Sequence, residues 1–135
     1  MDKNFYALGL MSGTSMDGID ASIITSNGID DFEIIQNNYY KYDDKLINKL
    51  SDLKNKINRL DDINLHINDL KSLEREITIL HAKFTNDILM NSKHKIDLVG
   101  FHGQTIYHNP DEKISKQLGD GKLLSQLVKK KVVYN

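Results

Sequence analysis

A short polar segment, GLMSGTSMDGID at residues 9–20, follows an apolar run near the start of the sequence. Its residue types are those that phosphate binding uses. Gly13 and Gly18 let the backbone come close to a ligand and adopt a positive φ where one is needed. The hydroxyl donors are Ser12, Thr14 and Ser15. With the backbone N–H groups of a tight turn, these hydroxyls could form an anion-binding concavity.

Two carboxylates in the same segment extend this hypothesis. Asp17 and Asp20 could hold Mg²⁺ directly or through water, because Mg²⁺ prefers oxygen ligands and retains much of its hydration. An ordinary hairpin with a polar loop explains the composition equally well, since Gly, Ser, Thr and Asp are also common turn residues.

A second candidate group, His102-Gly103-Gln104-Thr105, follows a predicted buried strand at residues 96–101. Open α/β sheets usually bind ligands at the carboxyl ends of their strands. The side chains of His102 and Gln104 suit sugar hydroxyls or an acetamido group. The alternative is a capped strand end with a hydrogen-bonded histidine. A metal site at His102 and His108 is disfavoured, because neither a third His nor a Cys lies near them in the sequence.

The segment GTSM at residues 13–16 is similar to the sequence around the nucleophilic serine of subtilisin-like proteases. The order along the chain excludes that assignment, because Ser15 precedes His102, whereas subtilisins place Asp, then His, then Ser. The nucleophile elbow G-x-S-x-G also fails, since Asp17 occupies the position of its last glycine.

Composition narrows the class of protein further. The sequence has 135 residues with 18 basic and 19 acidic side chains, a balance that does not favour nucleic acid or a membrane surface as partner. The absence of cysteine excludes a disulfide framework and a Cys nucleophile. No apolar run approaches the ~20 residues needed to cross a bilayer. We expect a soluble, cytoplasmic protein.

The pattern of apolar residues predicts three strands at the start, over residues 5–10, 19–25 and 32–42. Asn27-Gly28 is a strong hairpin signal, and short connections predict an antiparallel meander. The strand at 96–101 should lie parallel to the first one, because a long helical segment separates them.

Apolar residues then recur at helical spacing from Leu46 to Leu60 and again from Ile67 to Ile88. Asp43 and Asp44 suit the N-terminal cap of the first helix. Two amphipathic helices packed on a sheet are favoured, while a coiled coil or a helical interaction protein using this stripe remain alternatives. A short helix at 123–130 and a strand at 132–134 complete the predicted α/β order βββ–α–α–β–α–β.

The segments GLMSGTSMDGIDASI and DLVGFHGQTIYHNP, followed by Gln-Leu-Gly-Asp at 117–120, resemble anhydro-N-acetylmuramic acid kinases. The three segments have that family's order and approximate spacing. The resemblance implies an actin-like, ribonuclease-H-type sugar kinase fold that uses ATP and Mg²⁺ on an anhydro amino sugar. It also implies ring opening by water, the 6-phosphate as product, and a role in recycling the bacterial cell wall.

The same resemblance implies which residues take part. The ATP-binding segment would be Gly13, Thr14, Ser15, Met16, Asp17, Gly18, Ile19 and Asp20, with His102, Gln104 and Thr105 near the sugar. Met11 stands where the wider superfamily often has a metal-binding Asp, so the metal would be held by Asp17 or Asp20, possible ligands through water, or by a residue outside 1–135. A full-length enzyme of this kind is compatible with a homodimer.

The family places its catalytic Asp in a later Asp-Thr-Gly-Pro-Gly-Asn motif, which residues 1–135 do not contain. We therefore expect residues 1–135 to be the N-terminal part of the first lobe, without the second lobe and without kinase activity alone. A nucleotide-binding module without catalysis is the remaining alternative, and titration with Mg-ATP would separate it from a helical interaction protein.

Overall fold

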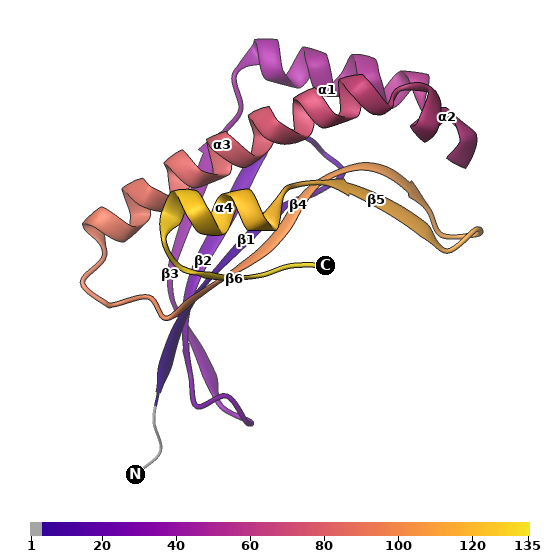
Figure 1. The fold of residues 1–135 in the computed structure, drawn as a ribbon. Helices are drawn as coiled ribbons and strands as arrows, with labels where there is room; N and C mark the ends of the chain where they lie inside the picture. The colour runs from indigo at the N-terminus through magenta and orange to yellow at the C-terminus, as the bar shows by residue number, and fades with distance from the viewer. Residues whose placement is uncertain (1–3) are drawn as a thin grey trace.

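The computed structural model describes residues 4–135 as a mixed α/β fold with one six-stranded sheet and a layer of helices (Figure 1). The strands are β1 (Phe5–Ser12), β2 (Gly18–Ser26), β3 (Phe32–Lys41), β4 (Leu98–Asn109), β5 (Ile114–Leu118) and β6 (Lys131–Val133). The helices are α1 (Asp44–Lys56), α2 (Leu60–Leu65), α3 (Ile67–Asn91) and α4 (Gly121–Val128).

The predicted meander is confirmed. β1 pairs antiparallel with β2, which pairs antiparallel with β3, and β4 joins the other side of β1 in parallel. The strand order is β3-β2-β1-β4-β5. β6 pairs in parallel with the start of β4, at Leu98–Gly100, whereas β5 pairs antiparallel with its later half. The central strands β1 and β4 therefore form the frame to which the candidate residues are attached.

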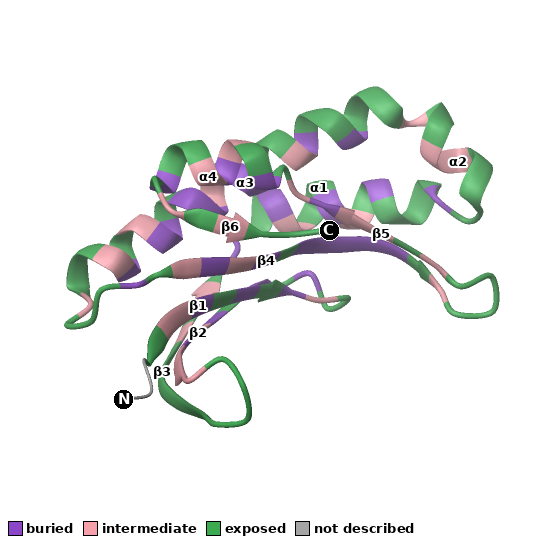
Figure 2. Cartoon of the chain, turned by 60° about the horizontal axis from the view of Figure 1, so that its bottom comes forward, coloured by how far each residue is buried: buried purple, intermediate pink, exposed green. Residues whose placement is uncertain are grey.

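The helices cover one face of the sheet and leave the other face open (Figures 1 and 2). The apolar stripe of α1 and α3 faces the sheet, and its buried members include Leu46, Leu50, Leu53, Leu70, Leu73 and Ile77. Because this stripe belongs to the core, it is not available to a partner helix, which removes the basis for the helical interaction protein. On the open face, Met11 is 55% exposed.

The helical region is interrupted, so the coiled-coil alternative is wrong. Asp43 caps α1 as predicted, with its carboxylate accepting from the Leu46 backbone N–H at 2.8 Å. The chain then leaves helical geometry at Ile57. The short helix α2 starts where the Asp62 carboxylate accepts from the backbone N–H groups of Asn58 and Arg59. These local side-chain bonds compete with a continuous helix.

The predicted order βββ–α–α–β–α–β lacks the short helix α2 and one strand, β5. β4 does not end at Phe101 but continues to Asn109, and a turn at Pro110–Lys113 leads into β5. The Asn109 side chain stabilises this turn by accepting from the Asp111 and Glu112 backbone N–H groups. The segment from His102 to Thr105 therefore lies inside a strand rather than at its end. Ser12, the last residue of β1, pairs with Gln104, so β4 runs on beyond the end of β1.

One buried hydroxyl in the core, that of Thr85, has no hydrogen-bond partner among the described residues. The Thr85 hydroxyl on α3 is the only buried side-chain N or O without a hydrogen-bond partner among residues 4–135. We expect Thr85→Val to raise the free energy of unfolding by about 1 kcal/mol, because it removes an unpaired hydroxyl and nearly keeps the side-chain shape.

Urea unfolding at pH 7 measures this change, and Thr78→Val is the matched control. Thr78 is equally buried on α3, but its hydroxyl donates to the Glu74 carbonyl at 2.8 Å and accepts from the Asp120 N–H at 2.9 Å. The control should lose about 1–2 kcal/mol. Equal losses in both variants would show that Thr85 has a partner in solution.

Candidate functional site

The loop between β1 and β2, residues 13–17, is a tight turn whose conformation depends on Met16. The Met16 N–H donates to the Gly13 carbonyl at 3.2 Å. Met16 has a φ of 54°, in the left-handed region that non-glycine residues seldom adopt, and its side chain is only 8% exposed. Neither Gly13 nor Gly18 has a positive φ. A buried methionine side chain therefore anchors the turn where glycine flexibility was the sequence-based expectation.

Gly13, the first residue of this loop, and Gly18, which follows it, have different roles. A Cβ on Gly18 would lie 2.2 Å from the Tyr40 carbonyl oxygen, so packing within the sheet already requires glycine there. A Cβ on Gly13 would meet no heavy atom within 4 Å. Nothing within the described chain demands glycine at position 13, and the space beside it is open to a ligand.

Both ends of the 13–17 loop are held from the interior. The Gln104 side-chain Nε2 donates to the Gly13 carbonyl at 2.7 Å. At the other end, the Tyr42 backbone N–H donates to the Asp17 carbonyl at 2.9 Å. The loop is thereby tied to β4 and to the segment that connects β3 with α1.

Asp17 is exposed and ionised more readily than an ordinary aspartate. The Ser15 hydroxyl donates to its Oδ1 at 2.8 Å. This hydrogen bond is the main reason that the Asp17 pKa lies below its usual value. The adjacent Tyr39 has a raised pKa, through desolvation first and the charge of Asp17 second. The loop thus presents a carboxylate to solvent at neutral pH.

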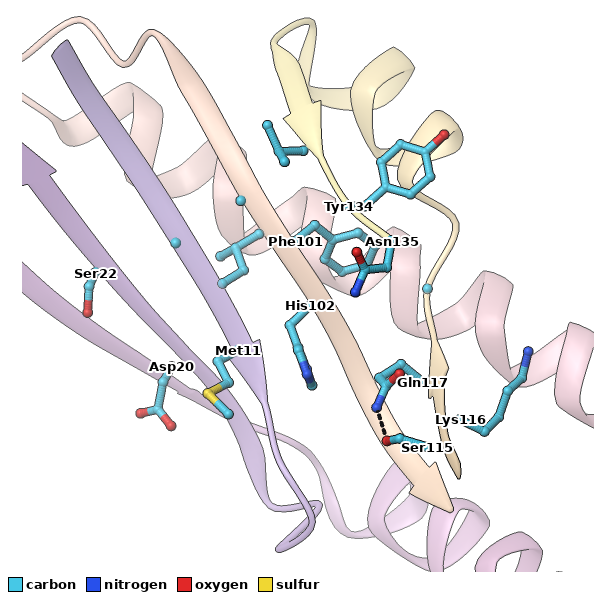
Figure 3. A pocket seen from close by; sticks show the side chains of 15 residues that line it. Met11, Asp20, Ser22, Phe101, His102, Ser115, Lys116, Gln117, Tyr134 and Asn135 are labelled. Atoms are coloured by element: carbon cyan, nitrogen blue, oxygen red, sulfur yellow. Dashed lines mark hydrogen bonds between the residues drawn. The ribbon is translucent and has the colours of Figure 1, made fainter. Parts of the chain in front are cut away.

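Asp20 and His102 lie on the open face of the sheet, on either side of Met11 (Figure 3). Asp20 on β2 pairs with Met11 on β1, and His102 projects from the adjacent strand β4. They line an open groove of about 810 Å³, a size that suits a small molecule. Its other polar side chains are Ser22, Ser115, Lys116, Gln117, Tyr134 and Asn135. Of the predicted ATP residues, only Asp20 lines this groove.

The other two predicted sugar residues lie inside the protein. Gln104 has no exposed surface, and Thr105 is 8% exposed. Besides Gly13, the Gln104 amide contacts the Thr105 carbonyl at 3.0 Å. The structure therefore brings His102 to the groove and Gln104 to the 13–17 loop. Residues two apart share a face in a regular strand, but the register with β1 shifts between Phe101 and Gln104, and Gly103 has a φ of 83°. This β-bulge puts His102 and Gln104 on opposite faces of β4.

A buried polar cluster that the sequence reasoning missed lies beneath the loop. The Tyr42 hydroxyl is 3.0 Å from both Ser12 Oγ and Gln104 Oε1, and Ser12 Oγ is 3.2 Å from His81 Nε2. These four side chains come from β1, the β3–α1 connection, α3 and β4, and each is at most 1% exposed. The sequence predicts the helix or strand near each of these residues but not that the four meet, so no local pattern indicates the cluster.

Protonation in this cluster follows from its partners. His81 Nδ1 is 2.8 Å from the Ile77 carbonyl, which can only accept, so Nδ1 carries the proton. Burial lowers the pKa of His81 to about 4, so Nε2 of the neutral ring accepts from the Ser12 hydroxyl. Burial also raises the pKa of Tyr42 to about 12, which keeps its hydroxyl protonated.

A dedicated metal site is not built from side chains alone. Among residues 4–135, no three His, Asp or Glu side chains gather at ligand distance. The available donors, two exposed carboxylates at Asp17 and Asp20, fit Mg²⁺ that retains waters and phosphate oxygens as its other ligands. Within the same residues, no helix is long and apolar enough to span a bilayer.

The fold is that of an α/β protein, with a groove on the open face of its sheet. The family model for anhydro-N-acetylmuramic acid kinase matches residues 5–135, and the chain belongs to this family.

Individual relatives agree. The chain is 53% identical over 135 residues to the anhydro-N-acetylmuramic acid kinase of Pelagibacter ubique. The match covers 100% of this chain and 36% of that protein. The kinase of that name from Brucella canis is 37% identical, with 96% of this chain and 35% of that protein covered. The Rhizobium etli kinase is 36% identical, with 100% and 37% covered. The chain thus spans about a third of the length of the relatives it matches.

Proposed function

We propose that residues 1–135 form the ATP-binding, N-terminal part of the first lobe of a cytoplasmic anhydro-N-acetylmuramic acid kinase. The reaction would use ATP and water to open the 1,6-anhydro ring and give the 6-phosphate, as a step in peptidoglycan recycling. The antiparallel meander with β4 parallel to β1 supports assignment to the actin-like, ribonuclease-H-type fold. Because the relatives are much longer, the catalytic base is assigned to their remaining length.

The observation that carries this proposal is the open space at Gly13 in a loop whose sequence matches the family. A phosphate could approach the backbone there, as it does at other glycine-containing anion sites. Ser12 is committed to the buried cluster, so the exposed hydroxyl of Thr14 is the first to face a phosphate. The Ser15 hydroxyl, which donates to Asp17, would face a phosphate only by giving up that bond.

The other residues of the segment would have supporting roles in ATP binding. Met16 fixes the turn, Gly18 and Ile19 begin β2, and Asp17 and Asp20 would bind Mg²⁺ through water. When bound, Mg²⁺ would neutralise phosphate charge, which phosphoryl transfer requires. This chain's residues would hold the phosphates in place and orient them.

The sugar would bind in the groove on the open face, where the imidazole of His102 can hydrogen-bond to a hydroxyl or an acetamido oxygen. Gln104 and Thr105 would support this region from within, since both are buried. The remainder of the site would come from the part of the relatives that this chain does not match.

Titration of the chain with Mg-ATP tests the proposal. We expect Gly13→Ala to weaken binding at least ~10-fold, because the added methyl occupies the space that a phosphate would use. Stability should change by less than ~1 kcal/mol, since Gly13 has neither a positive φ nor a close neighbour.

Calorimetric titration gives the affinity, and thermal unfolding gives the stability. Met90→Ala, at an 84% exposed position on α3, is the control and should bind as the wild type does. Absence of Mg-ATP binding by the wild-type chain would refute the ATP site. Unchanged affinity in Gly13→Ala would place the phosphates elsewhere.

A further inference from the structure

The 13–17 loop contains few bonds of its own. Within it, the Met16 N–H contacts the Gly13 carbonyl and the Ser15 hydroxyl contacts Asp17. The left-handed backbone of Met16 also makes the observed conformation costly, because a non-glycine residue is strained there. Contacts from outside the loop must therefore maintain its shape.

Tyr42 connects to both ends of the loop. Its backbone N–H binds the Asp17 carbonyl directly at 2.9 Å. Its hydroxyl lies 3.0 Å from Gln104 Oε1, and Gln104 Nε2 binds the Gly13 carbonyl at 2.7 Å. One residue therefore holds the exit of the loop through its backbone and the entrance through its side chain.

The orientation of the Gln104 amide is determined by its surroundings. Its Nε2 contacts two carbonyl oxygens, those of Gly13 and Thr105, and a carbonyl can only accept. A flipped amide would place Oε1 against both carbonyls, which is repulsive in a buried site. Oε1 must then face Tyr42, whose hydroxyl proton is the donor shared by Gln104 Oε1 and Ser12 Oγ, each 3.0 Å away.

Holding the Gly13 carbonyl inward has a geometric consequence for the loop. The peptide bond between Gly13 and Thr14 is trans, so its C=O and N–H point in opposite directions. With the carbonyl directed at Gln104, the Thr14 N–H is directed outward. It has no hydrogen-bond partner within residues 4–135, and it lies beside the open space at Gly13.

The geometry points to Tyr42 as a positioning residue that, through Gln104, aims the Thr14 N–H at a bound phosphate. This inference rests on the proposed function for the identity of the ligand. The cluster behind Tyr42 supports the assignment, because Ser12 and His81 are buried polar groups whose space apolar side chains could fill at lower cost. His81 holds Ser12 at 3.2 Å, and Ser12 Oγ in turn lies 3.0 Å from the Tyr42 hydroxyl and fixes its place.

The test compares Tyr42→Phe with Tyr107→Phe in the 135-residue chain. Both substitutions remove a tyrosine hydroxyl, but the hydroxyl of Tyr107, which is 9% exposed on β4, has only the Asn109 side-chain N–H as a hydrogen-bond partner within the described chain, at 3.4 Å. We expect Tyr42→Phe to accelerate hydrogen exchange of the residue 42 amide at least ~10-fold and to lower the ¹⁵N order parameters of Thr14 and Ser15. Tyr107→Phe should change neither. The affinity for Mg-ATP should fall at least ~10-fold in Tyr42→Phe and stay unchanged in Tyr107→Phe.

The two measurements separate the inference from the proposed function. Loop mobility and residue 42 exchange that are equal in both variants would overturn the positioning role, whether or not ATP binds. A mobile loop in Tyr42→Phe together with no Mg-ATP binding by the wild type would support the positioning role and refute the ATP site. A mobile loop with unchanged Mg-ATP affinity would overturn the aiming of Thr14 at a phosphate.

A measurement on the wild-type chain covers the case in which Tyr42→Phe does not fold. The side-chain amide protons of Gln104 should exchange at least ~10-fold more slowly than those of Gln126, which is exposed on α4. Equally fast exchange would show that Gln104 does not hold the Gly13 carbonyl, and it would overturn the inference.

Discussion

Replacement of Asp17 or Asp20 with alanine is expected to lower the rate of phosphoryl transfer about 100-fold or more, with the fold intact. Each change would remove a charge that holds the metal and, through it, the phosphates, and phosphoryl transfer depends almost entirely on such positioning and charge stabilisation. Both carboxylates are exposed, so their loss should change stability by less than ~0.5 kcal/mol.

The measurement requires the rest of the enzyme. A chimaera in which this chain replaces the matching part of the Pelagibacter ubique kinase provides it, since the two are 53% identical there. Formation of the 6-phosphate from anhydro-N-acetylmuramic acid and Mg-ATP is the readout. Asp111→Ala, an exposed carboxylate in the β4–β5 turn, is the control. If the Asp17 and Asp20 variants of an active chimaera react as fast as the control, residues 13–20 are an ordinary polar hairpin without a role in phosphoryl transfer.

Acidification is expected to destabilise the chain through His81. The pKa of His81 is lowered to about 4 in the folded protein by burial, against 6.5 for an unperturbed histidine. Above pH 6.5 the ring is neutral in both states, and its contribution to stability is complete. As the pH falls toward 4, the unfolded chain binds a proton that the folded chain does not. This difference removes on the order of 2 kcal/mol between pH 7 and pH 5.

Urea unfolding at a series of pH values measures this effect. His81→Gln is the matched variant, because it retains a polar side chain that can accept from Ser12 but does not titrate. The carboxylates contribute equally in both proteins, so the difference between the two pH profiles isolates His81. Parallel profiles would mean that His81 titrates normally and that the cluster beneath the loop opens to water.

Several features were predictable because their signals are local. Alternating apolar residues and the Asn27-Gly28 turn predicted the meander, and the 3.6-residue period predicted α1 and α3. Asp43 was recognisable as a cap from its place before the apolar stripe. The 13–20 segment was identified from its composition, and the family match confirms the resemblance on which its ATP-binding role was inferred. The role itself stays a prediction.

The extent of β4 was not predictable in the same way. Residues 102–105 contain a glycine and polar side chains, a composition that suits a loop, yet pairing with β1 and β5 keeps them in the sheet. Pairing between strands depends on partners elsewhere in the sequence, so it can override local preference. For this reason Gln104 is buried and supports the 13–17 loop, although the composition of residues 102–105 suggested the end of a strand.

The sequence by itself determined the strand and helix pattern, the residue types of the 13–17 loop and the family of the chain. Only the tertiary structure decided which side chains hold that loop. Tyr42 meets Ser12 across 30 residues and Gln104 across 62, and Ser12 meets His81 across 69. Such contacts leave no periodic or compositional signal, because they arise only when packing of the apolar stripe fixes α3 over the sheet and places these polar groups together away from water.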